Sequence, residues 1–237
     1  MALIINLESS TEVCSVSLSE NGELTDYIED TNGQNHSRLL SVFVDSLMNR
    51  NKLTFSDIDA VAVSKGPGSY TGLRIGVSLA KGICYGSNLP LIAISPLEAM
   101  ASYVRKNLSD FGLNDLKNPL FCPMIDARRM EVYTAIYNQQ GEEINPVSTE
   151  IIDEHHFSSL LKDHQLIFFG NGAKKCREKV SSPNAYFIDD LKTSAQFMCP
   201  LAEKAFENND LADLAYFEPF YLKDFIAGIP KKNILNR

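Results

Sequence analysis

A glycine-rich loop at residues 64–76, Ser-Lys-Gly-Pro-Gly-Ser-Tyr-Thr-Gly-Leu-Arg-Ile-Gly, is the part of the sequence best suited to binding an anion. It follows an apolar run at residues 59–63, which predicts a buried strand, and it precedes a predicted helix. Two glycines around a proline allow a tight turn, and Ser69 or Thr71 can cap the helix. Backbone N–H groups at the start of such a helix can bind a phosphate or a carboxylate.

The loop matches neither of the common nucleotide-binding fingerprints, G-x-x-x-x-G-K-[ST] and G-x-G-x-x-G. Its full pattern resembles the signature of the bacterial TsaB (YeaZ) family, which is close to G-[RK]-G-P-G-S-[FY]-T-G-[LV]-R-I-G, with Ser64 in place of the first glycine. Other motifs of that family follow the same order along the chain: Glu8-Ser9-Ser10-Thr11, Cys14-Ser15-Val16, Ile125-Asp126-Ala127-Arg128 with Glu131-Val132-Tyr133, and Pro219-Phe220-Tyr221-Leu222-Lys223. The resemblance therefore spans nearly the whole chain.

The composition is typical of an ordinary soluble globular protein. The net charge of −8 over 237 residues argues against a large basic surface for gripping nucleic acid, so we expect a partner to hold any RNA. The five cysteines include no C-x-x-C pair, which favours reduced thiols over disulfides or zinc. The sequence shows no segment like a signal peptide and no apolar run long enough to span a bilayer, so we expect a cytoplasmic protein.

Hydrophobic periodicity predicts the element order βββαβαβα in the first half of the chain. The expected strands lie at 2–8, 13–19, 23–28, 59–63 and 90–94, and the expected helices at about 36–50, 71–85 and 96–107. The same order recurs after residue 118, with strands near 120–125, 130–138, 143–150 and 166–169. We interpret this as a duplicated α/β unit with mixed sheets: an N-terminal lobe at 1–108, a C-terminal lobe at 109–210 and a partly flexible extension at 211–237. The resembled family has this two-lobe fold of the actin, hexokinase and Hsp70 (ribonuclease H-like) class.

In nucleotide-using members of that class, an Asp at the end of the first strand and the hydroxyl residues after it bind metal-bound phosphates. Glu8, Ser9 and Thr11 occupy that place here, and with Gly66 and Gly68 of the loop they are the candidate cofactor-binding residues. Glu8 is one methylene longer than Asp, which would disturb a metal or phosphate geometry tuned to Asp. The alternative is that Glu8 and Thr11 satisfy backbone groups at a strand end.

TsaD, the catalytic paralogue in the resembled family, carries a metal-binding H-x-x-x-H after the strand equivalent to residues 89–94. Pro96 and Met100 take the two histidine positions here, and neither can ligate a metal as imidazole does. No H-E-x-x-H or G-x-S-x-G motif occurs in the sequence. The resemblance therefore implies a chain that is not itself an enzyme, with no catalytic or metal-binding residues. It also implies no cofactor in the isolated chain, with ATP or ADP and metal in the partner subunits.

Two neighbouring predicted helices carry a wide apolar surface. Apolar residues form two ridges along the helix at 36–50, and small residues recur every four positions in the helix after the loop, which would let another helix approach closely. We expect a helix-bundle interface lined by Leu39, Leu40, Phe43, Leu47, Gly72, Leu73, Gly76, Val77 and Ala80. Burial of the whole stripe within one lobe is the alternative.

The hairpin that opens the second lobe carries charges of both signs in Asp126-Ala127-Arg128-Arg129-Met130-Glu131. We expect an Arg–carboxylate pair here to fix the hinge between the lobes. A substrate-binding role for Arg128 is the alternative.

The resemblance implies a role in making N6-threonylcarbamoyladenosine (t6A) at adenine 37 of tRNAs that read ANN codons. In that role the chain would be a noncatalytic scaffold that forms a heterodimer with TsaD, or a homodimer when alone. The ATPase TsaE would dock on the pair, and tRNA would be contacted indirectly, through the complex. The alternative is an independent small-molecule kinase or ATPase of the actin-like class, because fold does not fix function.

Overall fold

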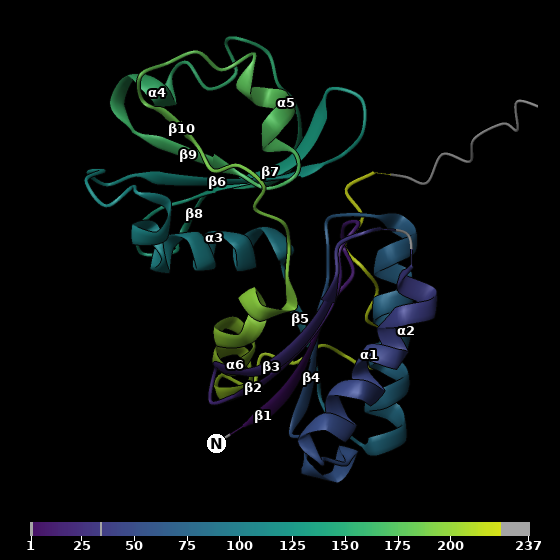
Figure 1. Cartoon of the computed structure of the whole chain (residues 1–237). Helices are drawn as coiled ribbons and strands as arrows, with labels where there is room; N and C mark the ends of the chain where they lie inside the picture. The colour runs from purple at the N-terminus through teal and green to yellow at the C-terminus, as the bar shows by residue number, and fades with distance from the viewer. Residues whose placement is uncertain (1, 34, 224–237) are drawn as a thin grey trace, which may run out of the picture.

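The computed structural model describes residues 2–33 and 35–223, which form two α/β lobes that lie one above the other in Figure 1. The N-terminal lobe has a five-stranded sheet of order β3-β2-β1-β4-β5. Its strands are β1 (Leu3–Glu8), β2 (Cys14–Glu20), β3 (Glu23–Asp30), β4 (Ala60–Ser64) and β5 (Leu91–Ile94). β1, β2 and β3 pair antiparallel, whereas β4 and β5 continue the sheet in parallel.

The C-terminal lobe repeats this plan. Its strands are β6 (Leu120–Asp126), β7 (Glu131–Tyr137), β8 (Glu143–Ile151), β9 (Leu166–Phe169) and β10 (Ala185–Phe187). They lie in the order β8-β7-β6-β9-β10, which is the order of the first sheet with each strand replaced by its counterpart. The predicted duplication of a mixed α/β unit is therefore confirmed, and the chain has the two-lobe fold expected from its sequence.

Local sequence explains the central strands and the first hairpin. β1 and β4 are apolar almost throughout because helices cover the sheet on both faces. Asn21 and Gly22 join β2 to β3 with φ of 53° and 77°, the left-handed backbone that a two-residue hairpin turn requires. The predicted Asn-Gly turn is confirmed.

The outer layers of the two lobes differ in size. Two long helices, α1 (His36–Asn51) and α2 (Tyr70–Ser87), pack on the outer face of the first sheet, and Leu40, Leu47 and Leu73 are buried beneath them. The equivalent positions in the second lobe hold only α4 (Leu160–Asp163) and α5 (Ala173–Arg177). Three short 3-10 helices complete the fold: η1 (Phe55–Asp57), η2 (Leu108–Phe111) and η3 (Ala195–Met198).

The inner faces of the two sheets are covered by exchanged helices. α3 (Pro96–Lys106) follows the last strand of the first sheet, yet it packs on β6 and β7 of the second sheet. α6 (Cys199–Glu207) follows the second sheet and packs on β1 and β5 of the first. Figure 1 shows α3 against the upper sheet and α6 beside the lower one. Each lobe therefore completes its core with a helix from the other half of the chain.

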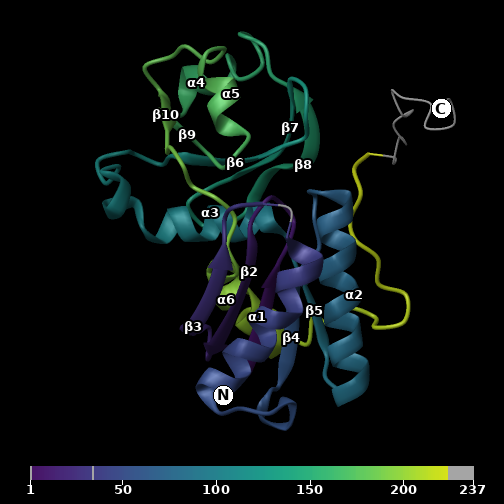
Figure 2. The same cartoon turned by 45° about the vertical axis from the view of Figure 1, so that its right-hand side comes forward.

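Residues 208–223, which we call the C-terminal strap, run back along the N-terminal lobe beside α2 (Figure 2). Ala212 forms an isolated antiparallel bridge with Leu91 on β5, and the Phe220 N–H donates to the Lys65 carbonyl at 2.7 Å. Lys81 of α2 donates to two strap carbonyls. The part of the predicted flexible extension at 224–237 lies outside the described residues.

Candidate functional site

The end of β1 and the loop that starts α2 are hydrogen-bonded to each other. The Ser69 N–H donates to the Ser10 carbonyl at 2.6 Å, and the Ser9 N–H donates to the Ser64 hydroxyl at 3.2 Å. Ser69 also caps α2 as predicted, because its hydroxyl accepts the Gly72 N–H at 3.3 Å. The N–H groups of Ser9 and Ser69, which could otherwise have bound a phosphate, therefore already donate hydrogen bonds within the chain.

Three glycines make this close packing possible. A Cβ on Gly68 would overlap the Ser10 carbonyl oxygen, one on Gly72 the Ser9 carbonyl oxygen, and one on Gly76 the Ser9 hydroxyl. Gly72 and Gly76 of α2 thus pack against the end of β1 in their own lobe. This corrects the interface expected at Gly72 and Gly76, because four-residue spacing predicts a small helix face without identifying what packs on it.

Gly66 is enclosed from the other side by the strap. Its φ of +102° is a backbone conformation that favours glycine, and a Cβ here would lie 2.8 Å from the Phe220 carbonyl oxygen. The peptide bond between Gly66 and Pro67 is cis. The loop is therefore held between Ser10 and the strap, and a phosphate could reach it only by displacing one of them.

Glu8 lies at the centre of this unit, with only 1% of its surface exposed. Its Oε1 accepts the Ser10 N–H at 2.6 Å, whereas its Oε2 and the hydroxyls of Ser9 and Ser10 have no hydrogen-bond partner within the described chain. Burial raises the pKa of Glu8, and the hydrogen bond from the Ser10 N–H opposes that rise. Because burial favours the neutral acid, Glu8 is poorly suited to hold a metal-bound phosphate, for which an ionised carboxylate is needed.

Thr11 satisfies a backbone group at the strand end, as the alternative expects, because its Oγ1 accepts the Val13 N–H at 3.2 Å. Its Oγ1 lies 2.7 Å from Oγ1 of Thr193, which belongs to the segment leading from the second lobe into η3. The structure therefore brings Glu8, Ser9 and Gly68 together, but it directs Thr11 to the connection between the lobes. Pro96 and Met100, at the family's histidine positions, are both buried in α3, and Met100 packs in the core beside Phe121.

Most of the residues expected at a partner interface are core residues of the N-terminal lobe. Five of them are at most 5% exposed: Leu40, Leu47, Leu73, Val77 and Ala80. All except Leu73 pack with strands of the first sheet, and Leu73 lies beside Gly66 of the loop. This narrows the expected surface, because a side chain in the chain's own core cannot contact a partner. The alternative of a buried stripe holds for these five residues.

Leu39 and Phe43 of α1 are partly exposed and remain candidates. The residues that accompany them are Val42, 52% exposed, with Ile75 and Leu79 of α2, which are partly buried, and Gly82, whose missing Cβ would face open space. We call these six residues the α1–α2 face. Gly82 also belongs to a second series of small residues at four-residue spacing, Ser78, Gly82 and Gly86, so the sequence carries a signal for this face as well as for the stripe at Gly72, Gly76 and Ala80.

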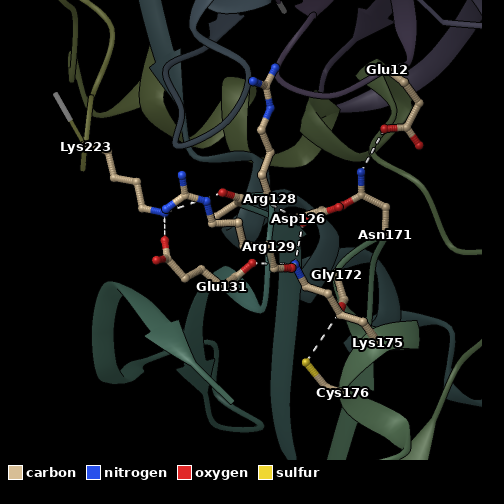
Figure 3. A network of polar contacts seen from close by, with 11 residues as sticks. Glu12, Asp126, Arg128, Arg129, Glu131, Asn171, Gly172, Lys175, Cys176 and Lys223 are labelled. Atoms are coloured by element: carbon tan, nitrogen blue, oxygen red, sulfur yellow. Dashed lines mark hydrogen bonds and ion pairs between the residues drawn. The ribbon is translucent and has the colours of Figure 1, made fainter. Parts of the chain in front are cut away.

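The β6–β7 hairpin carries a network of charged side chains (Figure 3). Asp126 pairs with Lys175 at 2.5 Å, and Glu131 pairs with Lys223 of the strap. The expected Arg–carboxylate side-chain pair is therefore wrong, since both carboxylates pair with lysines from distant segments. Arg128 contacts Asp126 through its backbone N–H, at 2.8 Å, and not through its guanidinium group.

A cross-lobe hydrogen bond lies beside this network. Asn171 Nδ2 donates to Glu12 Oε2 at 2.8 Å and joins the loop before α5 to the loop after β1 (Figure 3). The same asparagine accepts the Asp126 N–H through Oδ1 at 2.9 Å. The hinge contact expected near Asp126 is therefore made through Asn171.

Within residues 2–33 and 35–223, no three side chains of His, Cys, Asp or Glu are grouped so that they could share a metal ion. Among the helices of that same part of the chain, none combines the length and the apolar character needed to cross a membrane.

Comparisons with known proteins agree on one family. The family model for TsaD, tRNA N6-adenosine threonylcarbamoyltransferase, matches residues 28–231. The tRNA threonylcarbamoyladenosine biosynthesis protein TsaB of Escherichia coli K12 is 30% identical over 231 residues, covering 94% of this chain and 96% of the relative. Its namesake from Bacillus subtilis is 31% identical over 80% of both chains. The structure of YeaZ from Pseudomonas aeruginosa superposes with a TM-score of 0.78 at 25% identity, covering 94% of this chain and all of that one.

Proposed function

The chain belongs to the TsaB family of tRNA threonylcarbamoyladenosine biosynthesis proteins, and we propose that it serves there as a noncatalytic subunit that holds the transferase. The observation that carries this proposal is the closed loop at the start of α2. The Ser10 carbonyl on one side and the Phe220 carbonyl on the other enclose Gly68 and Gly66, the loop glycines proposed to bind a phosphate. A chain whose phosphate loop is filled by its own residues is suited to binding a partner.

The partner that we propose is TsaD, bound through the α1–α2 face. This face combines one exposed apolar side chain, Val42, and four half-buried ones with a glycine that lets another helix come close, which suits helix–helix packing across an interface. When TsaD is absent, a second copy of the chain would use the same face. TsaE would dock on the heterodimer, and ATP or ADP and any metal would be held by the partner subunits in the cytoplasm.

The alternative is an independent kinase or ATPase of the same fold. It requires Glu8 to be ionised and the loop between Ser10 and Phe220 to open, whereas burial favours the neutral form of Glu8. Saturable binding of ATP to the isolated chain, lost in Glu8→Ala, would favour this alternative. Calorimetric titration with ATP and Mg²⁺ distinguishes the two functions.

Pairing is tested by mixing the chain with its cognate TsaD and measuring the mass of the product by light scattering. Gly82→Arg places a long charged side chain on the α1–α2 face at a position open to solvent, so it should prevent pairing without unfolding the chain. Gln140→Arg makes a charged substitution at an exposed hairpin of the other lobe and is the matched control. A heterodimer that forms equally well with Gly82→Arg would reject the α1–α2 face, and no heterodimer with the wild type would reject the scaffold function.

A further inference from the structure

The turn between β6 and β7 presents two adjacent arginines on an unfavourable backbone. Arg128 and Arg129 have φ of +67° and +54°, in the left-handed region that residues other than glycine rarely adopt. Both residues are exposed, so burial of their side chains does not compensate for this conformation. Such backbone persists only where the surrounding structure imposes it.

Contacts from both sides impose it here. The Arg128 N–H donates to Asp126 Oδ1 at 2.8 Å, and Lys175 Nζ donates to the Arg129 carbonyl at 3.1 Å and to the Glu131 carbonyl at 2.5 Å. The Ala127 N–H donates to the Glu131 carbonyl at 3.1 Å and closes the turn. The backbone of the two arginines is thus fixed by hydrogen bonds that do not involve their side chains.

The positive charge of this cluster is not balanced. Lys175 and Lys223 neutralise Asp126 and Glu131, and neither guanidinium group has a hydrogen bond or ion pair with another residue in the described chain. Four cationic side chains therefore face two carboxylates, which leaves two positive charges. Burial and then the neighbouring Arg129 lower the pKa of Lys223, as expected where like charges are crowded together.

We infer that this turn binds phosphate groups of an RNA backbone. Guanidinium groups bind phosphate through paired hydrogen bonds, and two of them side by side on a rigid turn can contact successive phosphates. Figure 3 shows the arginines between the Lys223–Glu131 and Asp126–Lys175 pairs, close to the Glu12–Asn171 contact between the lobes. An exposed turn suits a polymer that passes over the surface, whereas a free nucleotide requires an enclosing pocket.

The inference rests on the proposed function, because the relatives' names place tRNA in the pathway. It adds a direct contact between this chain and tRNA. The net charge of −8 makes the chain unsuited to holding RNA alone. The turn would therefore contribute two phosphate contacts to a tRNA that is held mainly by the partner. The surplus charge and the strained backbone are features that a purely structural hairpin would not need.

The test measures tRNA binding to the assembled complex with TsaD by fluorescence anisotropy, over a series of KCl concentrations. The double variant Arg128→Gln/Arg129→Gln should bind at least about tenfold more weakly near 0.1 M salt. The slope of log K against log salt should fall in size by about 1.4 to 1.8, as expected for the loss of two phosphate contacts. The control Lys106→Gln/Lys117→Gln removes the same charge at two exposed sites, the end of α3 and the segment between α3 and β6, and should bind as the wild type does.

Light scattering on the same samples separates the possible failures. Equal affinity and slope in the arginine variant, with the complex intact, would overturn the inference while leaving the proposed function in place. Loss of the heterodimer in this variant would instead assign the turn to a protein contact. A wild-type complex that forms but binds no tRNA would also overturn the inference.

Discussion

The first strand of each sheet ends in a carboxylate, but the two carboxylates have opposite environments. Glu8 at the end of β1 is buried, with a raised pKa and no cation beside it. Asp126 at the end of β6 is exposed and paired with Lys175. The comparison shows that the duplicated unit kept its topology while its two copies diverged in chemistry: burial raises the pKa of the carboxyl in one copy, and the carboxylate in the other is exposed and paired with a lysine.

The outer helices account for this difference. In the first lobe, the 18-residue α2 lies over the end of β1 and buries Glu8. In the second lobe, α5 has 5 residues and leaves the end of β6 open to solvent. The glycine after the fourth strand is common to both lobes: Gly66 has φ of +102° and Gly170 has φ of +95°. The turn was therefore retained in both copies, whereas the helix that follows it is long only in the lobe whose carboxylate is buried.

The exchange of inner helices gives the largest expected effect. Leu97→Ala removes a fully buried side chain of α3 from the core of the second sheet and should lower the free energy of unfolding by about 2–5 kcal/mol. Because α3 and α6 tie the lobes together, urea unfolding followed by circular dichroism and by tyrosine fluorescence should give one coincident transition. Val42→Ala, at an exposed position of α1, should change stability by less than about 0.5 kcal/mol. Two separate transitions would show that the lobes fold independently.

The glycine contacts of the two lobes should be equally sensitive. A Cβ on Gly68 would overlap the Ser10 carbonyl, and one on Gly170 would overlap the Met124 carbonyl, so either Gly→Ala change should destabilise the protein by about 1–3 kcal/mol. Gly82→Ala is the control, since it adds a methyl group in open space within a helix and should stabilise by about 0.5–1 kcal/mol. Denaturant midpoints measure all three, and a neutral Gly68→Ala would show that the loop is looser than the structure indicates.

The buried carboxyl of the first lobe predicts a dependence on pH. The folded state raises the pKa of Glu8, so its favourable contribution is complete below the ordinary value of 4.5 and is lost as pH rises through the folded-state pKa. Glu8→Gln should therefore raise the melting temperature at pH 8, with the gain disappearing toward pH 4.5. Thermal unfolding of both proteins across this range tests it, and a gain that does not depend on pH would contradict a neutral Glu8.

The exposed carboxylate of the second lobe should matter least. Asp126→Asn removes a partly exposed ion pair, which contributes at most about 1 kcal/mol and is weakened by salt. Its effect on the unfolding free energy should shrink between 0.05 and 0.5 M NaCl, whereas that of Glu8→Gln should not. A loss well above about 1 kcal/mol would mean that Lys175 needs its partner in order to hold the turn at Arg129.

The order of elements was largely predictable from the sequence. Alternating and continuous apolar runs marked the main strands, the Asn-Gly pair marked the first hairpin, and Ser69 marked the start of α2, because each signal acts between residues close in the chain. The short α4 and α5 were less clear, since a helix of one turn carries little periodicity. The family motifs predicted a role in tRNA threonylcarbamoyladenosine biosynthesis, and the comparisons support this prediction.

What the sequence by itself determined is therefore the duplicated unit, its family and the identities of the residues at each strand end. Only the tertiary structure decided that α3 and α6 each pack on the sheet of the other lobe. It also decided that Ser9 and Ser10 pack against the glycines of the loop and α2, and that Lys175 pairs with Asp126, 49 residues away. Periodicity records which face of an element is apolar or small, but not which distant segment packs against it. Which segment packs where follows from the need to bury both faces of each sheet. The resulting packing buries the carboxyl group of Glu8 and leaves that of Asp126 exposed.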